Sequence, residues 1–396
     1  MNVLTVVCDV CWMKEHLVKT WEQMSEQVYT FFYPGMAKWH EGNWLNTRDI
    51  EAQRLLEKIE NITQASQIDL IFCVVYDDFF TPALCEKLGA FGIPLVNYHV
   101  DTDTQWYRCL RSARYFDLIG VAYKDYYEQL AALTDVIYLP MAANCDVYRP
   151  LNYVQKEIDV LFVGSYDIER ERAMSAIAEV ADSVVVYGSG WDRSVPIKAR
   201  VTVKYPIEKY VNDFKYYLLP RIKVEGIGRI FRKRKINATE DFPPYSGKLG
   251  GYLADEAFVS VVNHSKIVVG INQRFGSIGD PNGCVSGRLR DFEVPACGAT
   301  YLAQRYPELD VLFQEGRDIE GWSTLEELQY KITYYLNHEA EANALALNAR
   351  EKVLRDHTWK HRFDLILKRL QRNTRIKKQT SELTYPKKHD RLAVLS

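Results

Sequence analysis

The chain has 396 residues, which at roughly 150 residues per domain predicts two domains, each able to bury its own core. It is 47% hydrophobic and 26% charged with a formal net charge of -2, a globular balance that argues against a nucleic-acid-binding surface over the whole protein. Eight cysteines scattered along the chain indicate buried, reduced thiols and no disulfide framework.

The first residues, MNVLTVVCDVCW, are apolar but have no basic segment before them, and they lead directly into a charged, helix-like stretch. We therefore expect a first core strand here and no signal peptide. No apolar run approaches the roughly 20 residues that a membrane span needs. These features predict a cytoplasmic protein.

Residues 1–150 alternate short apolar runs with amphipathic segments. The strand-like runs are VLTVVC, DLIFCVV, IPLVNYHV, LIGVAY and VIYLP, and EAQRLLEKIENI, TPALCEKLGAF and KDYYEQLAAL have helical spacing. This alternation predicts a parallel sheet with helices on both faces. The polar segment LPMAANCDVYRPLNYVQKE then predicts a linker.

A second alternating series follows in residues 151–355. IDVLFVGS, SVVVYGSGW, SKIVVGIN and TYLAQ are strand-like, and IERERAMSAIAEVA, GRLRDFEVPACG and STLEELQYKITYYLNH are helix-like. The predicted fold is α/β, with two Rossmann-like doubly wound parallel-sheet domains facing a cleft. Residues 356–396 are expected to form a returning helix and a basic tail. Open parallel sheets bind ligands at the carboxyl ends of their strands.

The stretch RLRDFEVPACG places Glu293 at the start of an apolar helix-like segment. Carboxylates are seldom buried unless a partner pairs with them. A carboxylate at a helix start can accept two ligand hydroxyls, because it is acceptor-only and the helix end stabilises its charge. The alternative is an ion pair with Arg288 or Arg290.

RLRDFEVPACGATYLAQRYPELDVLFQEGRDI, together with the helical segments after it, resembles the carboxyl domain of glycosyltransferases of the GT-B fold. It is similar in particular to the CgeB-like family of spore-maturation proteins, whose members carry an Arg-x-Phe-Glu-Ile-Pro-Ala-x-Gly stretch. VLFVGS, VVVYGSGW and NHSKIVVGIN match that family in order. VVYDD, VNYHVDTD and YLPMAANCDVYRP are similar more loosely. The resemblance extends to about Leu370.

The resemblance implies a glycosyltransferase that moves a sugar from a nucleotide-sugar donor, held by the second domain, to a hydroxyl acceptor on the first. Glu293 matches the glutamate that accepts the donor's ribose hydroxyls. Many relatives carry a second glutamate eight residues earlier, where this chain has Val285. The expected donor-binding residues are Gly164, Ser165, Gly188, Gly190, Trp191, Lys266, Arg288, Phe292, Glu293 and Gly298.

Each expected donor contact has a reason and an alternative. The small turn at Gly164 and Ser165 can present backbone N–H groups to a diphosphate, or it can be a tight turn without a ligand. Lys266 and Arg288 can neutralise the leaving diphosphate, or they can be surface ion-pair partners. GSGW at 188–191 can brace the base or sugar, and it lacks the third glycine of a dinucleotide fingerprint, which disfavours an oxidoreductase.

Candidate catalytic residues follow two strands of the first domain. His99 and Asp101 end VNYHVD, and Asp77 and Asp78 end DLIFCVVYDD. Any of them can take the proton of an acceptor hydroxyl, and histidine suits this role near neutral pH. The alternative for each is a capped turn without chemistry.

We expect no metal and no cofactor besides the donor substrate. Asp101-Thr102-Asp103 is an Asp-x-Asp motif that can hold a divalent ion, but it is short and common by chance. Cys8 and Cys11 form a Cys-x-x-Cys pair without a second ligand pair at suitable spacing, so we expect them in or near the core.

The stretch YVNDFKYYLLPRIKVEGIGRIFRKRK, residues 210–235, interleaves aromatic and basic side chains. It can lie on an anionic membrane, bind a lipid-linked or other anionic acceptor, or form a solvated insertion. Nucleic acid is the least favoured partner.

Two rival functions remain for the whole protein: a sugar-nucleotide epimerase or phosphorylase of the same fold, and a catalytically silent binding protein.

Overall fold

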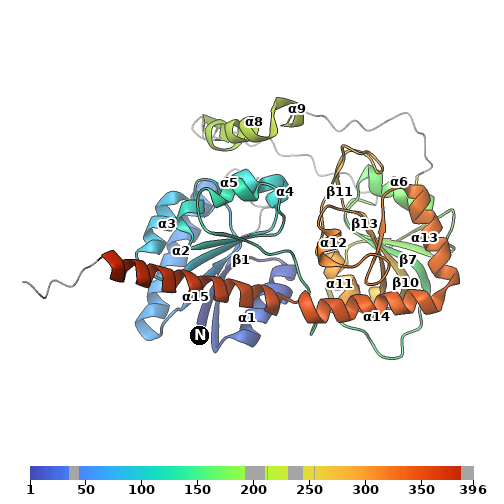
Figure 1. Cartoon of the computed structure of the whole chain (residues 1–396), viewed down its shortest axis with the longest axis horizontal. Helices are drawn as coiled ribbons and strands as arrows, with labels where there is room; N and C mark the ends of the chain where they lie inside the picture. Colours follow the sequence, from blue (N-terminus) through green and yellow to red (C-terminus); the bar gives the residue numbers. More distant parts are fainter. Residues whose placement is uncertain (35–43, 192–209, 212, 231–243, 254, 385–396) are drawn as a thin grey trace, which may run out of the picture.

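The computed structural model describes residues 1–34, 44–191, 210–211, 213–230, 244–253 and 255–384. Two parallel sheets lie side by side, each with helices on its faces (Figure 1). This arrangement confirms the predicted fold class.

The first domain contains a six-stranded sheet in the order β2-β1-β3-β4-β5-β6, in which every pairing is parallel. Six of the seven residues of β1 are buried, as expected for a strand covered on both faces. The chain leaves β1 toward β2 on one side and continues through β3 on the other, which makes the β1/β3 edge a topological switch point. Its elements are β1 (Asn2–Cys8), η1 (Met13–Val18), α1 (Lys19–Met24), β2 (Gln27–Tyr33), α2 (Trp44–Ala65), β3 (Leu70–Cys73), α3 (Pro82–Gly89), β4 (Leu95–His99), α4 (Thr102–Gln105), η3 (Trp106–Cys109), η4 (Ala113–Tyr115), β5 (Leu118–Val121), α5 (Tyr127–Ala131) and β6 (Val136–Tyr138).

The second domain contains the sheet β14-β13-β10-β7-β8-β9, again wholly parallel. Its switch point lies between β7 and β10, where ligands of open α/β sheets bind. An antiparallel hairpin, β11-β12, follows β10. The elements are β7 (Ile158–Val163), α6 (Ile168–Ile177), β8 (Val184–Tyr187), η5 (Phe214–Leu218), α8 (Leu219–Glu225), α9 (Ile227–Ile230), β9 (Lys248–Leu249), α10 (Asp255–Asn263), β10 (Ser265–Gly270), β11 (Gln273–Phe275), β12 (Cys284–Val285), α11 (Arg290–Ala296), β13 (Thr300–Gln304), α12 (Leu309–Leu312), β14 (Glu320–Trp322), α13 (Leu325–Asn337) and α14 (Glu339–Asp356).

Helix α15 (Trp359–Thr384) follows the second domain in sequence but returns to the first (Figure 1). Trp359 and Phe363 are buried in the core of the first domain, where Phe363 stacks on Trp21 at 4.1 Å between ring centroids. The buried guanidinium of Arg362 donates to the carbonyls of Pro140 and Met141. These contacts attach the last helix to the segment that joins the two domains.

Sequence periodicity missed several strands. The edge strand β2 and the two-residue strand β9 were not predicted, and neither was the β11-β12 hairpin. The segment after β1 forms a π-helix, η1, continued by α1. None of the helices in the described part of the chain combines the length and apolarity that crossing a bilayer requires.

Candidate functional site

Side chains that follow the strand ends of both sheets meet between the domains. Tyr123, just after β5, accepts a hydrogen bond from Arg288 (2.8 Å) and donates to the carbonyl of Gly287 (2.7 Å). Asp103, after β4, accepts from Arg274 (3.1 Å). His16, after β1, hydrogen-bonds Glu293 (2.7 Å). The interface therefore joins the carboxyl edges of the two sheets, where ligands of this class of fold bind.

Glu293 is fully buried and both of its oxygens have partners. Oε1 lies 2.7 Å from His16 Nε2, and Oε2 pairs with Arg290 one turn away. Burial by itself would raise the pKa of Glu293, but the Arg290 charge and the His16 hydrogen bond outweigh it and lower the pKa to about 2. Because the Asn144 N–H donates to His16 Nδ1, Nε2 is the ring nitrogen that donates to Glu293.

This geometry matches the alternative reading of Glu293, an ion pair with a nearby arginine, and adds a histidine from the other domain. A ribose contact would require one of these two partners to leave.

Phe292 and Gly298 also serve the protein's own packing. Phe292 is buried between Phe313 and His357. Gly298 ends α11 with a φ of 71°, a conformation that favours glycine. Their donor contacts stay predictions.

Two small-residue turns pack together beside the β7/β10 switch point. The N–H of Gly164 donates to the carbonyl of Tyr187 (2.8 Å). A Cβ at Gly188, whose φ is 145°, would clash with the carbonyl of Gly164. The Trp191 indole N–H donates to that same carbonyl (2.8 Å). Trp191 therefore braces the Gly164 turn of the protein itself, and only the turn's exposed rim remains for a ligand.

The rim of this turn carries Ser165 and Gly190, both exposed. Arg170, in the first turn of α6, donates to the Ser165 carbonyl (2.7 Å) and hydroxyl (3.1 Å). A cation thus stands next to the turn predicted to bind phosphate. Sequence reasoning had missed Arg170, although its place five residues after Ser165 was a usable signal.

Lys266 occupies the opposite edge of the sheet. It is the second residue of β10, at the strand's amino end, and it is exposed and paired with Asp159 at 2.6 Å. Asp159 likewise lies near the amino end of β7. This position contradicts the predicted contact of Lys266 with a diphosphate, because the switch-point ligand site lies at the carboxyl ends.

The candidate bases His99 and Asp101 differ in access. His99 is 1% exposed, and burial lowers its pKa to about 3, so the ring is neutral near pH 7. Its Nε2 lies 3.2 Å from the carbonyl of Gln105, and its buried Nδ1 has no hydrogen-bond partner among the described residues. Asp101 is partly exposed and accepts from Tyr76 and Gln105 (3.1 Å each). Burial raises the pKa of Asp101, with the nearby Asp103 charge adding to the effect.

Asp77 and Asp78 hold neighbouring segments. Asp77 is buried and accepts from the N–H groups of Arg111 and Ser112 (2.9 Å each) and from the Ser112 hydroxyl. Burial raises its pKa to about 7 in spite of these hydrogen bonds. Asp78 pairs with Arg108 and accepts from the Tyr217 hydroxyl (3.3 Å). Asp77 therefore matches the capped-turn alternative.

The side chains of the two candidate metal motifs, Asp101-Thr102-Asp103 and the Cys8/Cys11 pair, do not point at a common position. Asp101 and Asp103 face different partners, tyrosine and glutamine in one case and arginine in the other. Cys8 is buried, whereas Cys11 is exposed. In the ranges that the structure describes, no group of three or more His, Cys, Asp or Glu side chains is arranged to hold a metal ion.

The segment η5–α8, inserted between β8 and β9 of the second domain, reaches the first domain, and we call it the arm. Figure 1 shows it above α4 and α5. The Trp106 indole N–H donates to Glu225 of α8 (2.8 Å), and Tyr217 of η5 donates to Asp78. Two cation–π contacts join the same surfaces: Arg111 over Tyr216 at 4.5 Å and Arg221 over Tyr107 at 4.7 Å. The arm thus lies against the candidate acceptor side. Arg232, Lys233, Arg234 and Lys235 lie outside the described residues.

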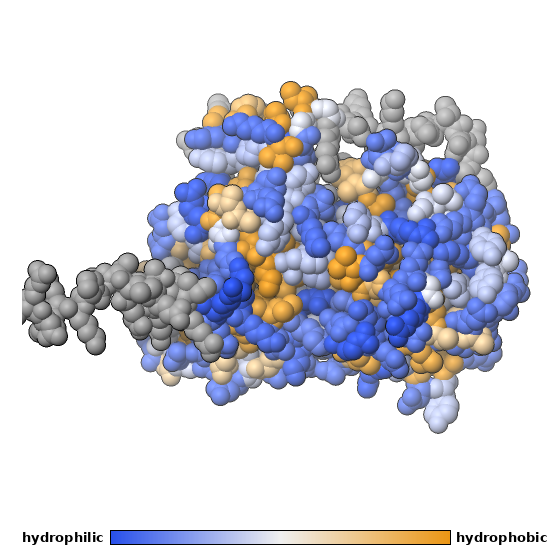
Figure 2. All heavy atoms as spheres, in the orientation of Figure 1, coloured by the Kyte–Doolittle hydropathy of each residue, from blue (hydrophilic) through white to orange (hydrophobic). Residues whose placement is uncertain are grey.

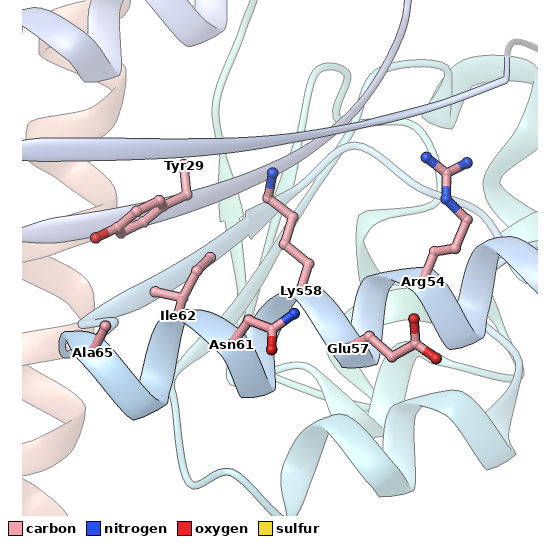
Figure 3. Close-up of a pocket in the computed structure, with 7 residues that line it drawn as sticks. All are labelled: Tyr29, Arg54, Glu57, Lys58, Asn61, Ile62 and Ala65. Carbon is pink, nitrogen blue, oxygen red and sulfur yellow. The ribbon is translucent and has the colours of Figure 1, made fainter.

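Two surface pockets of the first domain lie away from this interface. One, of about 490 Å³, lies between α2 and the amino half of β2 (Figure 3). Its lining residues are Tyr29, Arg54, Glu57, Lys58, Asn61, Ile62 and Ala65. The other lies at the amino ends of β3 and β4. Neither is near a strand's carboxyl end, so neither is the candidate site.

Comparison with known proteins supports the two-domain architecture. Residues 216–368 match the model of a family described as "Glycosyl transferase-like". No curated protein matches the sequence significantly. Among solved structures, HepE of Anabaena, in complex with UDP and glucose, is 14% identical, with a TM-score of 0.52 over 94% of this chain and 99% of that one.

Two further structures are similar over nearly their whole length. Sucrose-phosphate synthase of Thermosynechococcus elongatus is 12% identical, with a TM-score of 0.53 over 95% of this chain and 100% of that chain. A glycosyltransferase of Rickettsia africae is 12% identical, with a TM-score of 0.51 over 93% and 97%. The chain therefore has the GT-B fold of glycosyltransferases, and its residues 216–368 are similar to the glycosyl transferase-like family.

Proposed function

We propose that this protein is a glycosyltransferase that moves a sugar from a nucleotide-sugar donor to a hydroxyl acceptor. The observation that carries the proposal is the meeting of Arg274, Arg288, Asp101 and Asp103 between the carboxyl edges of two GT-B domains. The family match over residues 216–368 supports it. Within this class we assign the chain to the CgeB-like group, on its RLRDFEVPACG stretch.

The donor binds at the β7/β10 switch point. The exposed rim of the Gly164–Ser165 turn, with Arg170 beside it, takes part of the diphosphate, and Arg288 stabilises the charge that develops on the leaving group. No metal takes part, because these side chains supply the positive charge. The Anabaena protein was solved with UDP-glucose, so a UDP-sugar is the first donor to test.

Asp101 is the general base. Of the candidates it is the one that is both accessible and unpaired with an arginine: His99 is 1% exposed, and Asp78 pairs with Arg108. Burial raises the pKa of Asp101, which makes its carboxylate a stronger proton acceptor than a free aspartate. The Tyr76 and Gln105 hydrogen bonds both go to Oδ2 and hold the carboxylate in place.

A thermal-shift screen of nucleotides and nucleotide sugars tests the donor class. A ligand at 100 times its dissociation constant adds about 2.7 kcal/mol of stability. Donor turnover is then compared in the wild type and Asp101→Asn, which keeps size and hydrogen bonds but removes the base. We expect transfer to fall at least about a hundredfold while donor affinity is retained.

Other outcomes identify the rival functions. Nucleotide-sugar binding without hydrolysis or transfer to any acceptor indicates a silent binding protein. Interconversion of donor sugars without an acceptor indicates an epimerase. Absence of stabilisation by every nucleotide and nucleotide sugar contradicts the proposal.

We further propose that residues 210–235 contact an anionic membrane or a lipid-linked acceptor. The arm exposes Phe214 (54%), and Val211 and Ile227 on either side of it are 57% and 61% exposed; Figure 2 shows hydrophobic residues on the outer surface of this region. Apolar side chains next to a run of basic residues are typical of peripheral membrane contacts.

Sedimentation with anionic and neutral liposomes at low salt tests this contact. We expect the wild type to sediment with the anionic vesicles only. Phe214→Ser with Ile227→Ser, and separately the exchange of Arg232, Lys233, Arg234 and Lys235 for serine, should each reduce sedimentation without changing donor binding. A wild type that ignores anionic vesicles contradicts the membrane proposal.

A further inference from the structure

We propose that Arg274 binds the donor's diphosphate together with Arg288, and that Asp103 of the first domain occupies this diphosphate position in the ligand-free protein. The inference rests on the proposed function. It adds a binding residue to the donor site and a competing carboxylate supplied by the chain itself.

Arg274 stands where a switch-point ligand would lie. It belongs to β11, which begins three residues after β10 ends, and β10 pairs with β7 at the switch point. The same hairpin is held beside α6, because the N–H of Ile278 donates to Glu169 (2.9 Å). Helix α6 follows the Gly164–Ser165 turn, so Arg274 and that turn border the same edge of the sheet.

Two guanidinium groups of the second domain converge on one carboxylate of the first. Arg274 donates to Asp103 from Nε (3.1 Å) and Nη2 (3.4 Å), and also to Thr104 (2.8 Å). Arg288 Nη2 lies 3.7 Å from Asp103 Oδ2, and although buried it has no hydrogen-bond partner among the described residues. Asp103 itself is 3% exposed.

One carboxylate cannot satisfy these donors. Both guanidinium groups point at Asp103, with the Asp101 carboxylate nearby, and a buried N–H group of Arg288 is still left without a hydrogen-bond partner among the described residues, which is costly. A diphosphate has more oxygens and more charge, and arginine forks match its geometry in a bidentate manner. Exchange of Asp103 for a diphosphate would therefore satisfy both arginines.

Because the diphosphate replaces Asp103 beside the arginines, substitutions of the two partners of this ion pair should change ligand affinity in opposite directions. Arg274→Gln removes part of the diphosphate site and should weaken binding. Asp103→Asn removes the competing charge and should strengthen it, because the arginines no longer give up an ion pair when the ligand arrives. An ion pair that only joins the domains would give changes of the same sign in both variants.

Calorimetric titration with inorganic pyrophosphate and with UDP tests this inference. We expect Arg274→Gln to raise the dissociation constant of both ligands about tenfold or more, and Asp103→Asn to lower it several-fold. Arg369→Gln is the matched control, since Arg369 makes a similar two-point contact with Asp135 at the amino end of β6. This control variant should bind both ligands with the wild-type affinity. Arg274→Lys keeps the charge without the fork and should bind with intermediate affinity.

Melting temperatures are measured first, and Arg274→Lys replaces the glutamine variant if the latter does not fold. Wild-type affinity in both Arg274 variants overturns the inference and leaves the proposed function standing. Weaker binding in Asp103→Asn as well overturns it in favour of a purely structural pair. A wild type that binds neither ligand overturns the inference and the donor site together.

Discussion

Glu293 and His16 are 277 residues apart in sequence and share a fully buried hydrogen bond between the domains. Removing a carboxylate from water is costly, and the free energy is recovered only when charged and hydrogen-bonding partners surround it. Arg290 and His16 provide these partners. At this residue the structure shows a contact between the domains, whereas the family resemblance implies a ribose contact.

Exchange of Glu293 for glutamine should therefore destabilise the ligand-free protein. The amide keeps the shape but weakens the contacts to Arg290 and His16, and hydrogen bonds to charged groups contribute about 1.5–3 kcal/mol. Urea unfolding of Glu293→Gln should show a loss of this order. Glu341→Gln, on the exposed face of α14, serves as the control. Unchanged stability combined with a tenfold loss of nucleotide affinity would instead identify Glu293 as a ribose contact.

Two buried histidines should make stability depend on pH. Burial lowers the pKa of His99 and of His357 to about 3, and nearby Arg362 adds to the effect at His357. The unfolded chain, with histidine pKa values near 6.5, then binds more protons than the native protein between about pH 3 and 6.5. Their stabilising contribution is complete above about pH 6.5 and is lost as the pH falls.

In urea unfolding, the two histidines should lower the free energy at pH 4.5 relative to pH 7 by on the order of a few kcal/mol, and the raised pKa of Asp77, about 7, acts in the opposite direction. The range from pH 4.5 to 7 avoids most carboxylate titration in the unfolded chain. His99→Gln should show a smaller difference between the two pH values than the wild type. An equal difference in both proteins would contradict the assignment of His99.

The arm is an element of the second domain that lies against the first. Its residues Tyr217 and Glu225 bond to Asp78 and Trp106, which follow β3 and β4. The insertion between β8 and β9 therefore places part of the second domain against the first.

Loss of one arm hydrogen bond should loosen α8. Trp106→Phe removes the indole N–H that donates to Glu225 and keeps an aromatic ring beside Tyr126. Loss of about 1 kcal/mol should raise amide hydrogen exchange in Leu219–Glu225 roughly fivefold. Trp322→Phe, which removes an indole N–H bonded to Leu302 within the second domain, should leave α8 unaffected. Equal exchange in both variants would show that Trp106 does not hold the arm.

For the whole molecule, the two arginine side chains at the domain interface predict catalysis without a metal. Arg274 and Arg288 reach the interface, and Asp101 and Asp103 are bonded to different partners. We expect transferase activity to persist in EDTA, because arginines stabilise the leaving group's charge. Full loss in EDTA, restored by magnesium or manganese, would transfer that role to an ion held by the Asp101 and Asp103 carboxylates.

Local patterns were sufficient to predict much of the fold. Period-2 and buried apolar runs predicted nine of the parallel strands, and the glycine turns at Gly164 and Gly188 were placed at the ends of β7 and β8. Such features depend on neighbours in sequence, which fix backbone geometry and the side that is buried. The edge strands β2 and β9 were missed because edge positions need little apolar periodicity.

The site was decided largely by tertiary structure. The structure places Arg288 at the interface, where it donates to Tyr123, and Lys266 at the amino end of its strand, which only the sheet reveals. His16 and Arg274 were not identified, because their partners Glu293 and Asp103 belong to the other domain. Sequence alone determined the two doubly wound domains, since periodicity is a local property. Which charges face one another depends on how two separately folded sheets are seated, and no local pattern contains that information.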